Sequence, residues 1–220
     1  MSDVFKNPPP ALSNDYVFDI IKKHYDINPS LTPLVSDRDQ NFKITEEGKS
    51  HIFKIANSAE SKSVLEMQNS ALNYISKKDD SIEIPQPVKT IDGHDILSIQ
   101  ITNTKYYARL LTYVEGVFLK DVKPTNGTTF SVGKFLGYLD KGLAGFNHRA
   151  AKRKFIWDVS QVSLLKSNLT KDDFDLITFF INSFKHDISS LINDFPKTII
   201  HNDGNDHNIL LDSWNRVKGI

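Results

Sequence analysis

The chain has 220 residues, with 27 Lys and Arg against 27 Asp and Glu, so its formal net charge is zero. A balanced charge argues against a general binder of nucleic acids or anionic membranes, because both need an excess of basic residues. The absence of Cys excludes disulfides, thiolate nucleophiles and Cys-ligated metals. The start lacks the apolar core of a secretory signal, and no apolar run reaches the roughly 18 residues of a transmembrane helix. We therefore expect a soluble cytoplasmic protein.

The chain begins with a segment that predicts little regular structure and then a short helix. Residues 1–12 contain three consecutive prolines and predict a flexible lead-in. Ser13 is a typical helix N-cap, and apolar residues recur after it at helical spacing. The residues predicted to share one face of this helix are Val17, Ile20, Ile21 and Tyr25.

Strand-like segments dominate the next part of the chain. Leu31–Val35 leads into a polar loop, and four alternating or apolar runs follow. The runs are Asn41–Thr45, His51–Ile55, Ile96–Ile101 and Tyr106–Leu111. Glu46–Lys49 predicts the turn of a hairpin between the first two, and about Ala59 to Lys77 predicts a helix between the second and third. The first 115 residues therefore predict a small sheet with an inserted helix.

The remaining chain is mostly helical in pattern. Thr129–Asn147 and Lys171–Asn193 each carry apolar residues every three or four positions. Two short apolar runs, Thr198–Ile200 and Ile209–Leu211, predict strands on either side of a polar loop. A β-rich front and a helical back without βαβ alternation predict an α+β protein with two lobes.

The polar loop, His201–Asn208, is the strongest candidate for a functional site. Its spacing His-x-Asp-x-x-x-x-Asn matches the catalytic loop of kinase-fold phosphotransferases. In that chemistry the Asp orients the acceptor hydroxyl and the Asn holds a magnesium ion, roles that would fall to Asp203 and Asn208. The alternative is an ordinary surface turn, because Asn, Asp and Gly are common turn formers.

A lysine within an apolar strand is the second candidate. Lys54 lies in Phe53-Lys54-Ile55, where a kinase would hold the α/β-phosphates of its nucleotide; a lysine on a solvated strand face is the alternative. Glu66 and Gln68 are the possible partners in the following helix. The chain has no Gly-rich phosphate loop, and Asp37–Phe42 takes its place ahead of the hairpin, unless this segment is a plain charged turn.

Several motifs in order carry a family resemblance. The chain resembles the aminoglycoside phosphotransferase-type small-molecule kinases of the protein-kinase-like fold, with the hydroxylysine-kinase-like branch nearest. It is similar also to the kinase-like domain that opens certain multidomain bacterial aminotransferase proteins. The matching segments are Asp39–Phe42, Phe53–Ile55, Gln68–Leu72, Arg109–Gly116, Phe146–Ala151, Phe155–Asp158 and Ile200–Asn208.

The resemblance implies a division of the chain into lobes and a nucleotide site. It implies a nucleotide-binding N-lobe of sheet and helix over residues 13–114 and an incomplete, mainly helical C-lobe over residues 115–220. The hinge Thr112–Val114 would meet the purine through its backbone. The residues implied to bind ATP or GTP are Asn41, Lys54, Gln68, Thr112, Tyr113 and Val114.

The resemblance also implies how phosphoryl transfer would work. Asp203 would position the substrate hydroxyl, His201 would support the loop, and Asn208 would bind Mg²⁺. The acceptor would be a small polar amine or amino alcohol. Because phosphoryl transfer needs mostly positioning and charge stabilisation, these few polar residues would suffice once the metal site is complete.

Two departures from the family pattern affect these expectations. Gln68 stands where many relatives have a Glu that pairs with the strand lysine, so it can hydrogen-bond Lys54 but cannot neutralise it. Trp214-Asn215 predicts a turn and Val217–Ile220 a strand that leads toward an Asp-Phe-Gly-like metal-binding motif, which the sequence does not contain. We therefore expect negligible phosphotransfer from the 220 residues alone.

Three functional hypotheses follow. The first is a small-molecule kinase that transfers the γ-phosphoryl group of a nucleotide to a hydroxyl. The second is a non-catalytic kinase-like binding module of a larger aminotransferase-type protein, fused to further domains. The third is a two-lobed domain without phosphotransfer.

Overall fold

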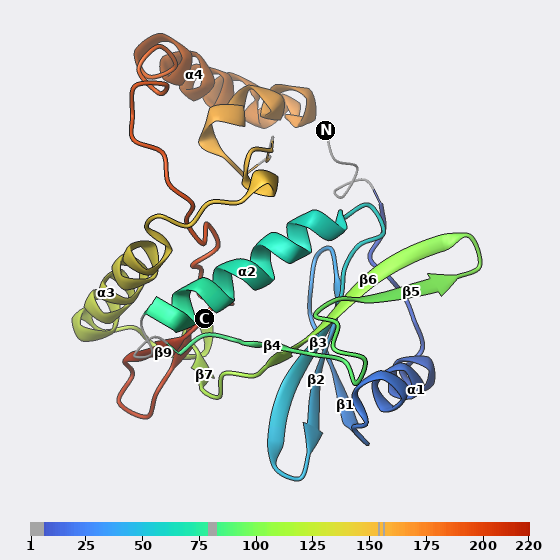
Figure 1. Ribbon diagram of the computed structural model, residues 1–220. Coiled ribbons are helices and arrows are strands. Elements are labelled where there is room, and N and C mark those ends of the chain that lie inside the picture. The colour runs from blue at the N-terminus through green and yellow to red at the C-terminus, as the bar shows by residue number, and fades with distance from the viewer. Residues whose placement is uncertain (1–6, 79–82, 154, 156) are drawn as a thin grey trace.

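The computed structural model describes residues 7–78, 83–153, 155 and 157–220. Residues 1–6 of the expected lead-in and Ile156 of one motif lie outside the described residues. The mixed α+β fold has two lobes, with helix α2 (Lys62–Lys78) between the larger sheet and helix α3 (Asn126–Leu143) (Figure 1). None of the helices in the described ranges is long and apolar enough to cross a membrane.

The larger sheet is antiparallel throughout. Its strands are β1 (Ser30–Leu34), β2 (Gln40–Glu46), β3 (Lys49–Ile55), β4 (Pro87–Val88), β5 (Leu97–Ile101) and β6 (Thr104–Thr112). They pair in the order β1-β2-β3-β6-β4, and β5 also pairs with β6. The predicted hairpin is confirmed, because Glu47 and Gly48 turn between β2 and β3 with φ values of 49° and 78°. Positive φ at both central residues matches the right-handed twist of the flanking strands.

Helix α1 (Asn14–Tyr25) covers one face of this sheet. Its start is the predicted one, since the Ser13 side chain accepts a hydrogen bond from the Tyr16 N–H. The four residues predicted to share a face are the four that the helix buries. They pack in one core with the sheet residues Phe42, Phe53 and Leu110, which lie directly opposite one another across β2, β3 and β6.

The segment before α1 also contacts the sheet. Leu12 exchanges two hydrogen bonds of 2.9 Å with the Gln40 side chain at the start of β2. The buried Asn57 amide donates to the backbone oxygens of Asn7 and Pro8 at 3.1 and 3.2 Å. Residues 7–12 are therefore tied to the sheet.

Helices α2 and α3 share a second core. Their buried contacts include Ile75 on α2 and Phe135, Leu139 and Leu143 on α3. Both helices were predicted, with different bounds: α2 begins at Lys62, and α3 runs from Asn126 to Leu143. Thr125 and Thr128 form a capping box that fixes the earlier start of α3.

A second, three-stranded sheet supports the polar loop. Its order is β7-β8-β9, formed by Val117–Phe118, Leu210–Leu211 and Val217–Gly219. The predicted turn is confirmed, with Asn215 at φ 57° between β8 and β9. The strand predicted at Thr198–Ile200 is wrong, because this segment has no strand pairing and Ile200 is 46% exposed. The partner of β8 comes instead from β7, far upstream.

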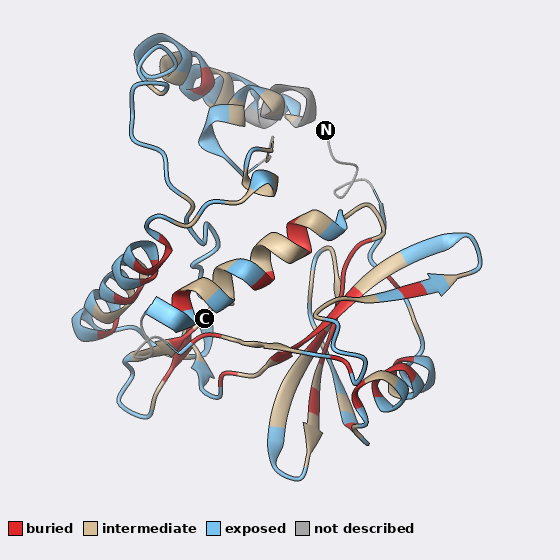
Figure 2. Ribbon diagram, viewed as in Figure 1, coloured by how far each residue is buried: buried red, intermediate tan, exposed pale blue. Residues whose placement is uncertain are grey.

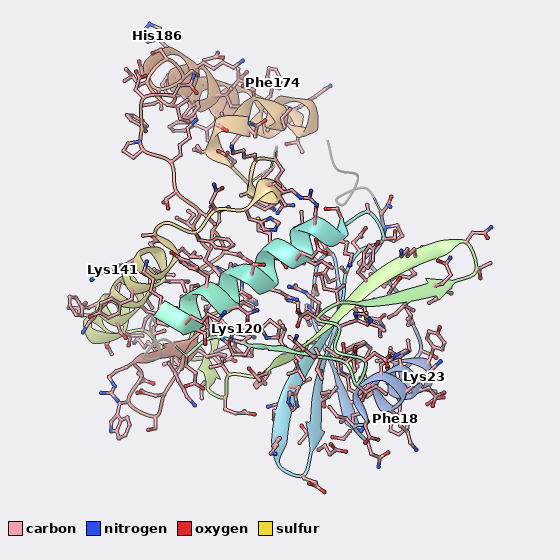
Figure 3. The ribbon with its side chains drawn as sticks, in the orientation of Figure 1. Phe18, Lys23, Lys120, Lys141, Phe174 and His186 are labelled. Atoms are coloured by element: carbon pink, nitrogen blue, oxygen red, sulfur yellow. The ribbon has the colours of Figure 1, made fainter. Side chains whose placement is uncertain are left out.

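Helix α4 (Lys171–Asp187) is largely exposed, although Ile181 on it is buried. It ends before the predicted Asn193 and packs against the 3₁₀ helix Val159–Asn168. Figure 2 shows that most of its surface is exposed, and Figure 3 shows Phe174 and His186 on α4 far from Phe18 and Lys23 on α1. Several of its large apolar side chains are exposed: Phe174, Leu176, Phe179 and Phe180.

Candidate active site

A row of three polar side chains crosses the face of the larger sheet opposite α1. Asn41 pairs with Lys54 and Lys54 pairs with Arg109 across β2, β3 and β6. Residues directly opposite in antiparallel strands point to the same face, and neighbours in sequence point to the other. The burial of Phe42, Phe53 and Leu110 against α1 therefore turns this set, the polar row, away from the apolar core.

Lys54 is half-buried and makes no hydrogen bond or ion pair with the residues that the structure describes. Desolvation lowers its pKa below the ordinary value of 10.5, and the positive charge of Arg109 lowers it further. The carboxylates of Asp39 and Asp203 act in the opposite direction. Lys54 therefore lies within electrostatic range of Asp203, the residue that the sequence singled out in the other lobe.

Arg109 is the most buried charged residue of the polar row, at 5% exposure. Its Nη1 donates to Asn69 Oδ1 at 2.8 Å and its Nη2 donates to Gln68 Oε1 at 2.6 Å. Burial lowers the pKa of Arg109 to about 10. The sequence proposed Lys54 as the hydrogen-bond partner of Gln68, whereas in the structure Gln68 accepts from Arg109.

Asn41 completes the polar row beside Lys54. The residue is 9% exposed, and its side-chain Oδ1 accepts no hydrogen bond within the described ranges. A buried acceptor without a donor destabilises a fold by about 1–3 kcal/mol. Asn41 Oδ1 is therefore an unsatisfied, buried acceptor within the polar row.

The predicted hinge has one open backbone donor. The Thr112 N–H donates to Gln86 O at 2.9 Å, and the Tyr113 N–H donates to Ser50 O at 3.2 Å. Val114, by contrast, donates its N–H to no acceptor in the described part of the chain. The Val114 side chain contacts Gly219, where an added Cβ would lie 2.8 Å from Val114 Cγ1. Of the three predicted hinge residues, Val114 is thus the one whose N–H has no acceptor among the described residues.

The polar loop is held by hydrogen bonds among its own side chains. Asp203 Oδ1 accepts from Asn205 Nδ2 at 2.8 Å, and Asp203 Oδ2 accepts from Asn208 Nδ2 at 2.8 Å. Asn208 Nδ2 also donates to the Asp203 backbone oxygen at 3.0 Å. Two amides therefore fix the orientation of the carboxylate, while Asp203 itself remains exposed.

His201 lies at the start of this loop. Its ring is accessible to solvent, yet the surrounding protein desolvates it enough to lower its pKa, while the Asp203 carboxylate opposes this shift. His201 forms no hydrogen bond with any described residue. Support of the loop by His201 therefore stays a prediction.

The donor atoms near Asn208 suit magnesium. Because the Asn208 amide nitrogen faces the Asp203 carboxylate, its Oδ1 is free, and it accepts no hydrogen bond from the described chain. Amide and carboxylate oxygens are the protein ligands that Mg²⁺ prefers. Within the described residues no group of three or more His, Asp or Glu side chains could hold a metal ion, so Asn208 Oδ1 is the candidate ligand.

Three further residues of the site had no role in the sequence reasoning. Arg109 and Asn69 lie inside segments that carried the resemblance, and Asn205 lies within the polar loop. An arginine in the apolar run Tyr106–Leu111 is the signal that would have identified Arg109, since an unpaired charge is rarely buried in a strand. Its amide partners depend on the docking of α2, which no local pattern encodes.

Comparison with known proteins identifies relatives for nearly the whole chain. The chain is 32% identical to hydroxylysine kinase from Xenopus laevis over 97% of its own length and 63% of that protein. It is 29% identical to hydroxylysine kinase from Danio rerio over 94% of its length and 62% of that protein. The chain thus spans less than two thirds of the length of these relatives.

Solved structures show the same fold. An amicoumacin kinase in complex with AMP-PNP, Ca²⁺ and Ami has a TM-score of 0.72 at 17% identity, covering 95% of this chain and 63% of that one. A microcompartment-associated aminopropanol kinase has a TM-score of 0.65 at 16% identity, covering 91% and 65%. The protein-kinase-like fold is therefore confirmed. The model of the phosphotransferase enzyme family matches residues 30–220, and the chain belongs to this family.

Proposed function

We propose that the chain carries the donor site and polar loop of a small-molecule kinase, which transfers the γ-phosphoryl group of ATP or GTP to the hydroxyl of a small amine or amino alcohol. The proposal rests on two geometric observations: Lys54 lies opposite Arg109 on the polar face of the larger sheet, and two amides orient the Asp203 carboxylate on the polar loop. These observations support a cation for the donor phosphates on one lobe and a carboxylate for the acceptor hydroxyl on the other. This arrangement suits positioning of the two reactants, the main contribution of a protein to phosphoryl transfer.

Each residue then has a defined task. Lys54 binds phosphate oxygens, the Val114 N–H meets the purine, and Asp203 orients the acceptor hydroxyl. Asn205 and Asn208 hold the Asp203 carboxylate in place. Asn208 Oδ1 would hold a magnesium ion, which would neutralise part of the negative charge of the donor.

The proposal for the acceptor rests on the relatives and on the charge of the loop. Hydroxylysine kinase and aminopropanol kinase are named for molecules that carry both an amine and a hydroxyl. Asp203 and Asp206 are exposed carboxylates on the polar loop, which favour an ammonium group near the reacting hydroxyl. We therefore propose an amino alcohol as the acceptor.

Calorimetric titration with Mg·ATP and Mg·GTP tests the donor site directly. It measures binding, so the test does not depend on phosphoryl transfer. Lys54→Met should weaken nucleotide binding on the order of a hundredfold, because it removes a partly desolvated charge that contacts phosphate. Lys105→Met is the matched control, since Lys105 is an exposed lysine on β6 of the same sheet. Equal affinities for the unaltered chain and Lys54→Met would overturn the proposal.

A further inference from the structure

Two positively charged residues are neighbours in the polar row, and neither forms an ion pair with a carboxylate of the described residues. Lys54 and Arg109 are directly opposite on β3 and β6, and the charge of Arg109 acts on Lys54 strongly enough to lower its pKa. Arg109 is almost fully buried, yet its two hydrogen-bond acceptors are the neutral amides of Gln68 and Asn69. Burying a cation without a counter-charge destabilises a protein, because the charge loses its solvation.

Two carboxylates, Asp39 and Glu60, act on Arg109 through their charges. Both already have other partners. Asp39 Oδ1 accepts from the Asn57 N–H at 3.1 Å, and Glu60 Oε1 pairs with Arg153 Nη1 at 3.8 Å. They reduce the positive potential around Arg109 but make no ion pair with it. The row therefore keeps an excess of positive charge.

A purely structural link between α2 and the sheet would not need this charge. A Glu at position 68 would give Arg109 a two-point ion pair and would tie α2 to β6 more strongly. Gln68 instead holds the guanidinium in place by a hydrogen bond and leaves its charge uncompensated. Asn69 is fixed in turn, because its Nδ2 donates to the Asp95 backbone oxygen at 3.3 Å.

We propose that Arg109 is a second cation of the donor site, held by Gln68 and Asn69, whose charge adds to that of Lys54 and makes the site select for the polyphosphate chain of a nucleotide. Arg109 acts on the phosphates from a distance, through its electrostatic field, and is not itself a phosphate ligand. Gln68 has the specific role of presenting Arg109 without neutralising it. This inference rests on the proposed function, since it names a further determinant of the same donor site.

The decisive variant is Gln68→Glu, because the two possible roles of Arg109 predict different affinity ratios for it. The added carboxylate neutralises Arg109, and the ratio of ATP affinity to adenosine affinity should fall on the order of tenfold, as expected for loss of one charge at several ångströms in a partly buried site. The same variant should raise the melting temperature of the unligated chain, because the buried guanidinium gains a counter-charge. If Arg109 only anchors α2, the variant becomes more stable and the affinity ratio stays unchanged.

Two variants of Arg109 complete the test. Arg109→Met removes the charge and should lower the same ratio by a similar factor, whereas Arg109→Lys keeps the charge and should retain most of the ratio despite lower stability. A general loss of folded protein does not change this ratio, because ATP and adenosine both bind only to the folded chain. Should Arg109→Met fail to fold, Gln68→Glu alone decides.

The outcomes separate this inference from the function on which it rests. Calorimetry would be done at fixed free Mg²⁺, in chloride buffer without phosphate, with adenosine, ADP and ATP. A ratio within twofold of the unaltered chain for Gln68→Glu overturns the role of Arg109 and leaves the nucleotide site intact. Equal binding of adenosine and ATP by the unaltered chain, or binding of neither, overturns both proposals.

Discussion

The polar row on the larger sheet and the polar loop of the other lobe are held in place in different ways. Lys54 and Arg109 lie on paired strands whose opposite face is filled by the apolar core under α1. Asp203 and Asn208 lie on an exposed loop and are oriented by hydrogen bonds between side chains of that loop. The sheet thus presents partly desolvated cations on a rigid support, and the loop presents a solvated carboxylate.

Under the proposed function, this difference would divide donor affinity and acceptor chemistry between the two lobes. Charges in a partly buried site act more strongly on an anionic ligand than charges in water, so the sheet is suited to binding the donor. An exposed carboxylate keeps its solvation and suits the handling of an acceptor hydroxyl. Changes on the sheet should therefore alter donor affinity and stability together, while changes on the loop should leave stability nearly unchanged.

Phe53→Ala should have the largest effect, because it removes the support of the polar row. Phe53 is fully buried and packs edge-to-face against Tyr25 with 6.1 Å between ring centroids. Truncating such a side chain destabilises a core by about 3–5 kcal/mol. Urea unfolding followed by circular dichroism would measure the loss. A change below about 1 kcal/mol would contradict the packing described for the N-lobe.

Lys54→Met should separate binding from stability. The unligated chain should be as stable as the unaltered one or more stable by about 1 kcal/mol, because a partly desolvated, unpaired charge is replaced by an apolar side chain of similar length. Nucleotide affinity should fall sharply in the same variant. Thermal unfolding with and without Mg·ATP gives both quantities, and a large loss of stability without nucleotide would argue against an unpaired Lys54.

Alkaline pH should reproduce part of this change in the unaltered chain. Because burial lowers the pKa of Lys54 below 10.5, the unfolded chain binds a proton that the folded chain has lost in the window just below that value. Lys54 therefore makes stability rise with pH across this window. ATP affinity should fall over the same range as Lys54 loses its charge. Both slopes should be weaker in Lys54→Met, and identical slopes in the two proteins would refute the assignment.

Asp203→Asn should have a smaller effect on binding, with the opposite sign. The Asp203 charge raises the pKa of Lys54 and repels phosphate, so its removal should tighten ATP binding by about two- to threefold. Stability should change by less than about 1 kcal/mol, since the carboxylate is exposed. Calorimetry against the unaltered chain would measure the affinity. Weaker binding would show that Asp203 contributes to donor affinity. It would contradict the assignment of donor binding to the polar row alone.

Phe179→Ser should change stability least. Phe179 is 63% exposed on α4, and surface substitutions typically change the free energy of unfolding by less than about 0.5 kcal/mol. The substitution provides a matched aromatic control for Phe53→Ala under the same urea conditions. A loss comparable to that of Phe53→Ala would mean that α4 packs more tightly than described.

The sequence predicted the features that depend on local pattern. The buried face of α1 follows from helical spacing after the Ser13 cap, and the β2–β3 hairpin follows from two β-prone runs around a Gly-containing turn. The matching of Lys54, Asp203 and Asn208 to a kinase site required the order of several motifs, because each alone also fits an ordinary strand or turn. Coupling between Lys54 and Asp203 appears only when the lobes meet.

Features that depend on distant partners were not predictable. Thr198–Ile200 has the composition of a strand, but the pairing position beside β8 is taken by β7, from the segment that follows the hinge. Gln68 was assigned to Lys54 because both residues fit a family pattern, whereas the docking of α2 places its amide on Arg109. Short pairs and side-chain partners of this kind are decided by tertiary packing.

A crystal structure of the chain with AMP-PNP and Mg²⁺ tests the central claim most directly. The account predicts phosphate oxygens within about 3.2 Å of Lys54 Nζ, the purine at the Val114 N–H and the metal at Asn208 Oδ1. It also predicts that Arg109 keeps its bonds to Gln68 and Asn69 beneath the phosphates. A nucleotide whose phosphates lie away from the polar row would contradict the account.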